Sequence, residues 1–168
     1  MKTLFLVRHA KSSWDDALLP DPERPLSKRG KRDAPEAGDR LAKRDASPAL
    51  ILSSPARRAL TTAKIIARKL GYSPEDIEVD NRLYLGTLDD LLSVIHNLDD
   101  KLERVMLFGH NPGLAELAYG FSRTITRMPT CAVAEFTFDA QSWSNIGKTN
   151  LASVVHDYPK KYRGKASP

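Results

Sequence analysis

Apolar residues along the chain follow two alternating spacings, which predicts alternating strands and helices. Short apolar runs, typical of buried parallel strands, occupy residues 3–7, 50–52 and 105–108. Longer stretches with helical spacing follow them, at residues 31–44, 56–70, 88–98 and 112–120. Further short strands are expected at residues 77–79, 133–138 and 151–155. This order predicts an α/β fold, a three-layer α/β/α sandwich around a mostly parallel central sheet.

Two motifs predict where helices begin. Ser54-Pro55 and Asn111-Pro112 each place a capping side chain before a proline, which suits the first helical position. Residues 14–28 carry three prolines and are expected to form a long loop beside the end of the first strand. Loops of this length in compact domains are often functional.

Chain length and composition indicate one globular domain spanning residues 1–168, with a basic tail from about 157 to 168. The chain is 41% hydrophobic and 28% charged, and its first apolar run is too short for a signal peptide or a membrane span. We therefore expect a cytoplasmic protein with no membrane partner. Cys131 is the only cysteine, which excludes an internal disulfide and argues against a cysteine metal site.

The formal net charge of +5 is compatible with an anionic substrate or with nucleic acid. The basic residues are spread along the chain, so no nucleic-acid partner is expected. The one dense basic stretch is predicted to be a solvated terminus and comprises Lys160, Lys161, Arg163 and Lys165.

Polar groups follow three of the predicted strands directly. They are Arg8-His9, Ser53-Ser54 with Arg57-Arg58, and Gly109-His110-Asn111. Parallel strands end at one edge of a sheet, so we expect these groups to converge there. Arginine forks and helix N-termini both bind anions. The sequence therefore predicts a pocket for a tetrahedral dianion such as phosphate.

Two histidines in this pocket indicate a reaction as well as binding. His9, at a strand end, is the expected nucleophile toward phosphorus, and His110 is expected to donate to a phosphate oxygen. Ser12 and Asn111 are candidate phosphate contacts, although Asn111 also suits a simple turn. Because arginines supply the positive charge, no metal and no cofactor are expected.

The three motifs, in this order, resemble the histidine phosphatase superfamily, whose fold is phosphoglycerate mutase-like. Within it the chain is most similar to the SixA-type phosphohistidine phosphatases, over residues 2–156. The resemblance implies that His9 accepts the phosphoryl group, that Arg8 and Arg58 hold it, and that His110 is the second catalytic histidine. The competing arginine is Arg57.

Two positions depart from the family pattern. Ala10 replaces the commoner glycine, and Asp15 stands where phosphoglycerate mutases carry an asparagine. Residues 81–86, where many members carry an acid, contain no carboxylate, and Asp80, Asp89 and Asp90 flank the gap. Without an acid an alcohol leaves poorly, whereas the conjugate acid of an imidazole has a pKa of about 6.5.

These observations favour a metal-independent phosphatase that dephosphorylates phosphohistidine in a protein. The resemblance implies an HPt domain or a phosphotransferase-system protein as that partner. Two alternatives stay open: a small-molecule phosphomonoesterase with the same site, and a non-catalytic phosphate-binding scaffold. The oligomeric state is not predicted.

Overall fold

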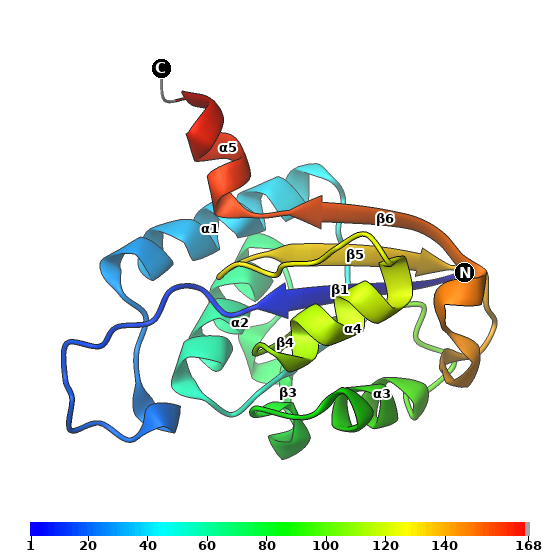
Figure 1. Cartoon of the computed structure of the whole chain (residues 1–168), viewed down its shortest axis with the longest axis horizontal. Helices are drawn as coiled ribbons and strands as arrows, with labels where there is room; N and C mark the ends of the chain where they lie inside the picture. The colour runs from blue at the N-terminus through cyan, green and yellow to red at the C-terminus, as the bar shows by residue number, and fades with distance from the viewer. Residues whose placement is uncertain (167–168) are drawn as a thin grey trace.

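The computed structural model describes residues 1–166 and has a six-stranded sheet between two layers of helices (Figure 1). The strand order is β3-β2-β4-β1-β5-β6. Only β5 runs opposite to its neighbours, so the sheet is mostly parallel, as predicted. The strands are β1 (Lys2–Arg8), β2 (Leu50–Ser53), β3 (Glu78–Val79), β4 (Arg104–Gly109), β5 (Val133–Phe138) and β6 (Leu151–Asp157).

The described residues form five α-helices, of which α1 to α4 cover the sheet while α5 projects beyond the end of β6 (Figure 1). They are α1 (Lys28–Lys43), α2 (Arg57–Lys69), α3 (Leu88–His96), α4 (Gly113–Ser122) and α5 (Pro159–Ala166). Side chains of a strand alternate between its two faces. In β1, Leu4 and Leu6 therefore pack in the core formed with α3 and α4, whereas Phe5 and Val7 pack in the core formed with α1 and α2. The predicted three-layer sandwich is confirmed.

Both predicted helix caps are wrong, although both helices exist. Helix α2 begins at Arg57 and α4 at Gly113, without a capping side chain at either N-terminus. The Ser54 hydroxyl instead contacts His110, and the Asn111 amide donates to the carbonyl of Met128. Both side chains therefore contact residues that are distant along the chain, although the Ser54 oxygen also accepts the nearby N–H of Ala56.

The predicted basic tail begins inside regular structure, although Lys160 and Lys161 are exposed, as expected of a solvated terminus. Strand β6 continues to Asp157, which is buried and paired with Arg40 at 2.8 Å, and α5 follows from Pro159 to Ala166. Residues 167–168 of the predicted tail lie outside the described part. None of the described helices is long and apolar enough to span a membrane.

The parallel strands bring the three polar motifs to one edge. Strand β4 lies between β2 and β1, and its last residues pair Gly109 with Arg8 and Phe108 with Ser53. The backbone N–H of His9 donates to Gly109 at 3.2 Å, which extends the ladder past the strand end. The chain therefore leaves all three strands side by side at their carboxyl ends.

Candidate active site

His9 is held in one orientation and one tautomer. The residue is only 7% exposed, and its Nδ1 lies 2.8 Å from the carbonyl oxygen of Ala10. A carbonyl only accepts hydrogen bonds, so a neutral His9 carries its proton on Nδ1 and keeps a lone pair on Nε2. Burial, followed by the charges of Arg58 and Arg8, lowers the pKa of His9 to about 4. The ring is therefore neutral at pH 7, as a nucleophile must be.

His110 faces His9 across the site, with 5.1 Å between the ring centroids. Its Nε2 lies 2.8 Å from Oγ of Ser54, and the same oxygen accepts the N–H of Ala56 at 3.1 Å. Burial, followed by the proximity of His9, lowers the pKa of His110 to about 3, so this ring is neutral too. The Ser54 hydroxyl can then donate to Nε2, which places the ring proton on Nδ1. That Nδ1 is buried and has no hydrogen-bond partner among the described residues.

Ser54→Ala is expected to impair both activity and stability. The substitution removes the group that sets the His110 tautomer and leaves Nε2 and the Ala56 N–H without their partner. We expect phosphate release to slow about tenfold and the free energy of unfolding to fall by about 1–2 kcal/mol. Kinetics and denaturant unfolding measure the two effects.

Ser53→Ala is the matched control for that variant. Ser53 is equally buried, but its hydroxyl donates to the backbone oxygen of Ser54 and does not contact His110. The control should keep its rate. A Ser54→Ala enzyme as active as Ser53→Ala would show that the hydroxyl does not orient His110.

Arg58 points inward from the first turn of α2, whereas its neighbour Arg57 is exposed. The Arg58 side chain is only 5% exposed. Its Nη1 donates to the backbone oxygen of Asp21 at 2.8 Å, and its Nη2 donates to Oδ2 of the same residue at 2.9 Å. The guanidinium is thus fixed near both histidine rings, whose pKa values its charge helps to lower.

Arg8 and Asn111 meet at one backbone group. Arg8 donates through Nη1 to the carbonyl oxygen of Met128 at 3.1 Å, and Asn111 donates through Nδ2 to the same oxygen at 2.8 Å. Nε of Arg8 and Oδ1 of Asn111 are buried without a hydrogen-bond partner in the part of the chain that is described. Asn111 and Arg8 therefore share one acceptor, and the contact of Asn111 with phosphate stays a prediction.

Ser12 contacts another arginine. Its Oγ accepts a hydrogen bond from Nη2 of Arg24 at 2.6 Å, and the Arg24 guanidinium stacks 3.1 Å from the ring centre of Trp14. Ser12 thus anchors the long loop, and its contact with phosphate also stays a prediction. Thr62 fixes the residue that follows His9, because its hydroxyl accepts the backbone N–H of Ala10 at 3.0 Å.

Asp21 is a site residue that the sequence analysis missed. Its carboxylate accepts hydrogen bonds from Arg58, from the Tyr84 hydroxyl and from Arg24. The bond from Tyr84, together with those from the arginines, lowers the pKa of Asp21 to about 2. The only sequence signal for it was its place in the proline-rich loop, because no motif marks a carboxylate there.

The three carboxylates that the sequence offered as candidate general acids form contacts elsewhere or are exposed. Asp80 accepts from the side chain of Arg82 at 2.7 Å, and Asp90 forms a capping box with Thr87 at the start of α3. Asp89 is exposed in the first turn of the same helix. Within the described part of the chain, none of the three forms a hydrogen bond or ion pair with a histidine of the site, so Asp21 is the carboxylate bound to site residues.

In the part of the chain that the structure describes, no three His, Cys, Asp or Glu side chains form a cluster that could hold a metal ion. The site has a different composition, with two guanidinium groups beside two neutral imidazoles. Buried donors of this kind bind and polarise an oxyanion. Together with the fold, they define a phosphate-handling α/β enzyme.

Comparison with known proteins identifies its family. Residues 4–84 match the histidine phosphatase superfamily (branch 1). A protein of Arabidopsis thaliana, described only as uncharacterized and chloroplastic, is 33% identical over 150 residues, which cover 84% of this chain and 69% of that protein. The chain belongs to the histidine phosphatase superfamily, and this family together with its structural neighbours supports phosphatase activity.

Solved structures agree with this assignment and with a phosphoglycerate mutase-like fold. The Agrobacterium tumefaciens protein assigned as phosphohistidine phosphatase SixA has a TM-score of 0.77 and 26% identity, over 94% of this chain and 98% of that one. A protein histidine phosphatase SixA with bound tungstate has a TM-score of 0.73 and 21% identity, over 93% of this chain and 94% of that one. A mycobacterial glucosyl-3-phosphoglycerate phosphatase has a TM-score of 0.64 and 16% identity, over 95% of this chain and 99% of that one. The latter two likenesses concern the fold alone.

Proposed function

We propose that the protein is a metal-independent phosphatase that forms a phosphohistidine intermediate on His9 and acts on phosphohistidine in a protein. The observation that carries this proposal is the hydrogen bond from Nδ1 of His9 to Ala10, which leaves Nε2 as a free nucleophile. Arg8 and Arg58 bind the phosphoryl oxygens through their forked donors. Nδ1–H of His110 donates to a further oxygen and stabilises charge in the transition state.

The reaction proceeds in two displacements at phosphorus. Nε2 of His9 attacks, a new P–N bond forms, and the bond to the substrate imidazole breaks with its electron pair going to that nitrogen. The proton on the other nitrogen of the substrate ring lets the imidazole leave in its neutral form. Water then attacks the phosphorylated His9, its P–N bond breaks, and inorganic phosphate leaves. The water proton passes to solvent, and His9 returns to its neutral form.

The state of Asp21 supports a P–N substrate. A pKa of about 2 keeps this carboxylate ionised at neutral pH, and it already accepts three hydrogen bonds. It is therefore a poor proton donor for an alkoxide leaving group, whereas an imidazole takes its proton readily near neutrality. The similarity to the Agrobacterium protein assigned as SixA supports the same substrate class.

A small phosphomonoester is the second candidate, and Tyr84 is the observation that favours it. The Tyr84 ring stands edge-on to His110 with 5.5 Å between centroids, and its hydroxyl lies in the Asp21 network. A phenol at this place could donate a proton where no carboxylic acid does. The fold shared with the glucosyl-3-phosphoglycerate phosphatase is compatible with this candidate.

The test compares phosphate release from a phosphohistidine-containing protein and from a panel of phosphomonoesters, with a metal chelator present. We expect the P–N substrate to be hydrolysed at least about 10²-fold faster in kcat/KM, which corresponds to about 2.7 kcal/mol of selectivity. Faster turnover of an ester would replace the proposal by the second candidate. Failure to turn over either substrate would favour a non-catalytic phosphate-binding protein.

The cytoplasm is the proposed location of this activity. The chloroplastic description belongs to the Arabidopsis relative. Cell fractionation of the tagged full-length protein tests the proposal, and recovery in an organelle fraction would contradict it.

A further inference from the structure

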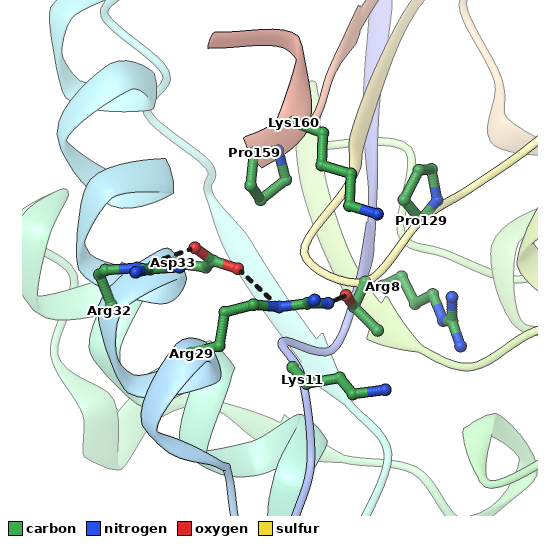
Figure 2. A pocket seen from close by; sticks show the side chains of 9 residues that line it. Arg8, Lys11, Arg29, Arg32, Asp33, Pro129, Pro159 and Lys160 are labelled. Carbon is green, nitrogen blue, oxygen red and sulfur yellow. Dashed lines mark hydrogen bonds and ion pairs between the residues drawn. The ribbon is translucent and has the colours of Figure 1, made fainter. Parts of the chain in front are cut away.

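A hollow of about 480 Å³ lies next to Arg8, outside the histidine pair (Figure 2). Its lining is dominated by positive charge. The charged lining residues are Arg8, Lys11, Arg29, Arg32, Lys160 and Asp33. Five are cationic and one is acidic, which gives the hollow a formal charge of +4. We call it the cationic pocket.

Separate elements of the chain build the cationic pocket. Arg29 and Arg32 come from the first turns of α1, and Lys160 comes from the first turn of α5. Figure 2 shows Lys160 reaching from α5 toward Pro129, opposite the two arginines of α1. Helix α1 is held against the loop after His9, since the N–H of Ser27 donates to the carbonyl of Lys11 at 2.9 Å. The position of each charge is thus a product of the tertiary fold.

Asp33 offsets only part of this charge. Its carboxylate is buried and lies 3.7 Å from Nε of Arg29 and 3.8 Å from Nε of Arg32. Arg29 also donates to the hydroxyl of Thr130 at 3.2 Å. These contacts orient the guanidiniums, while Arg32 and Lys160 remain exposed to an incoming anion. A pocket with preoriented, partly exposed cations attracts anionic groups.

Arg8 links the cationic pocket to the candidate active site. Its side chain lines the pocket, and its charge contributes to lowering the pKa of the proposed nucleophile His9. Arg8 turns its guanidinium away from Asp33, as Figure 2 shows. A chain that presents its phosphorylated residue to His9 can therefore lay neighbouring residues in the pocket, at about 3.3 Å per extended residue.

The number and spread of the cations indicate more than one anionic group. Arg8, Arg32 and Lys160 come from three separate elements and enclose a volume much larger than one phosphate ion occupies. We propose that the cationic pocket binds acidic side chains that flank the phosphohistidine of a protein substrate. This inference rests on the proposed function and names the kind of protein segment that the site accepts.

The pocket is expected to act on substrate encounter and binding, since its charges lie at a partly exposed rim. Charges of this kind raise association rates and are weakened by salt, and they contribute little to the chemical step. An acidic substrate should therefore show a lower KM at an unchanged kcat. The advantage over a neutral substrate should shrink at high salt.

Two synthetic phosphohistidine peptides provide the test. One carries aspartates on both sides of the phosphohistidine, and the other carries asparagines at the same positions. The test variant is Arg32→Gln with Lys160→Gln, which keeps Asp33 facing Arg29. The matched control is Lys28→Gln with Lys31→Gln, two exposed α1 lysines outside the pocket lining. Both variants lose two positive charges.

We expect wild type to prefer the acidic peptide, and the test variant to lose about fivefold in kcat/KM on that peptide through KM. The control variant should keep the preference, and hydrolysis of the neutral peptide should not change in either. Equal losses of kcat/KM on the acidic peptide in both variants would show that only the overall charge of the protein matters, and would overturn the proposal. An equal loss on both peptides would also overturn it, because the pocket would then serve the phosphoryl group itself.

Failure of the proposed function gives a different result. Wild type would then hydrolyse neither peptide, and fluorescence anisotropy with the labelled acidic peptide still reports on the pocket. Binding that weakens in the test variant but not in the control would support the pocket without the phosphatase reaction. Absence of binding, or equal binding of the acidic and neutral peptides, would overturn the inference about the pocket.

Discussion

His9→Ala is expected to reduce phosphate release from any substrate by at least about 10⁴-fold, because the variant lacks the atom that forms the covalent intermediate. Wild type quenched during turnover should carry phosphate that is stable to alkali and lost in acid, as a P–N bond is. The variant should carry none. Intact-protein mass spectrometry under alkaline conditions measures the adduct, and a phosphate-release assay measures the rate.

His96→Ala is the matched control for the nucleophile. His96 lies at the end of α3, where its Nε2 is 3.4 Å from the carbonyl of Ile146, and among the described residues it forms no hydrogen bond with the candidate active site. Its removal should leave both adduct and turnover in place. An adduct that persists in His9→Ala would assign the nucleophile to another residue and would refute the proposed mechanism.

Arg58→Ala is expected to lower kcat/KM by about 10³-fold, or about 4 kcal/mol of transition-state stabilisation. Arg58→Lys keeps the charge but loses the forked pair of N–H donors, so its kcat/KM should still be about 10²-fold lower than that of wild type. The exposed Arg57 supplies the control, since Arg57→Ala removes the same side chain one position earlier in the same helix. Steady-state kinetics on one substrate compares all three variants.

A change of fold would complicate that comparison, because Arg58 also binds Asp21 from the long loop. Thermal unfolding of each variant separates the two effects. If Arg57→Ala costs as much activity as Arg58→Ala, the choice between the two arginines was wrong. Retained vanadate binding in a folded Arg58→Ala protein would argue that Arg58 does not hold the phosphoryl group.

The two arginines have a second consequence in this arrangement. Both Arg8 and Arg58 lower the pKa of His9, although burial has the larger effect. The cations that are proposed to bind phosphate thus also keep the nucleophile unprotonated in mildly acidic solution. Arrival of a dianion would offset the same charges and favour protonation of His110, which would strengthen its donation to phosphate.

The fold was predictable because its signals are local and repeated. Apolar runs of strand length and helical apolar spacing each follow from burial of one strand or one helix face, and the strands at residues 3–7 and 105–108 appear as β1 and β4. Helix boundaries were less accurate: α1 begins at Lys28, earlier than residue 31, because the Ser27 side chain accepts the N–H of Gly30.

Sequence alone was enough to predict the candidate site residues: Arg8-His9, Arg58 and His110 stand directly beside strands or helix starts, and parallel strands necessarily end at one edge. Their surroundings follow from the tertiary structure. Asp21 on Arg58, Ser54 on His110 and the cationic pocket all join segments distant along the chain. Such contacts depend on how loops and helices pack across the sheet, and no local spacing encodes that packing.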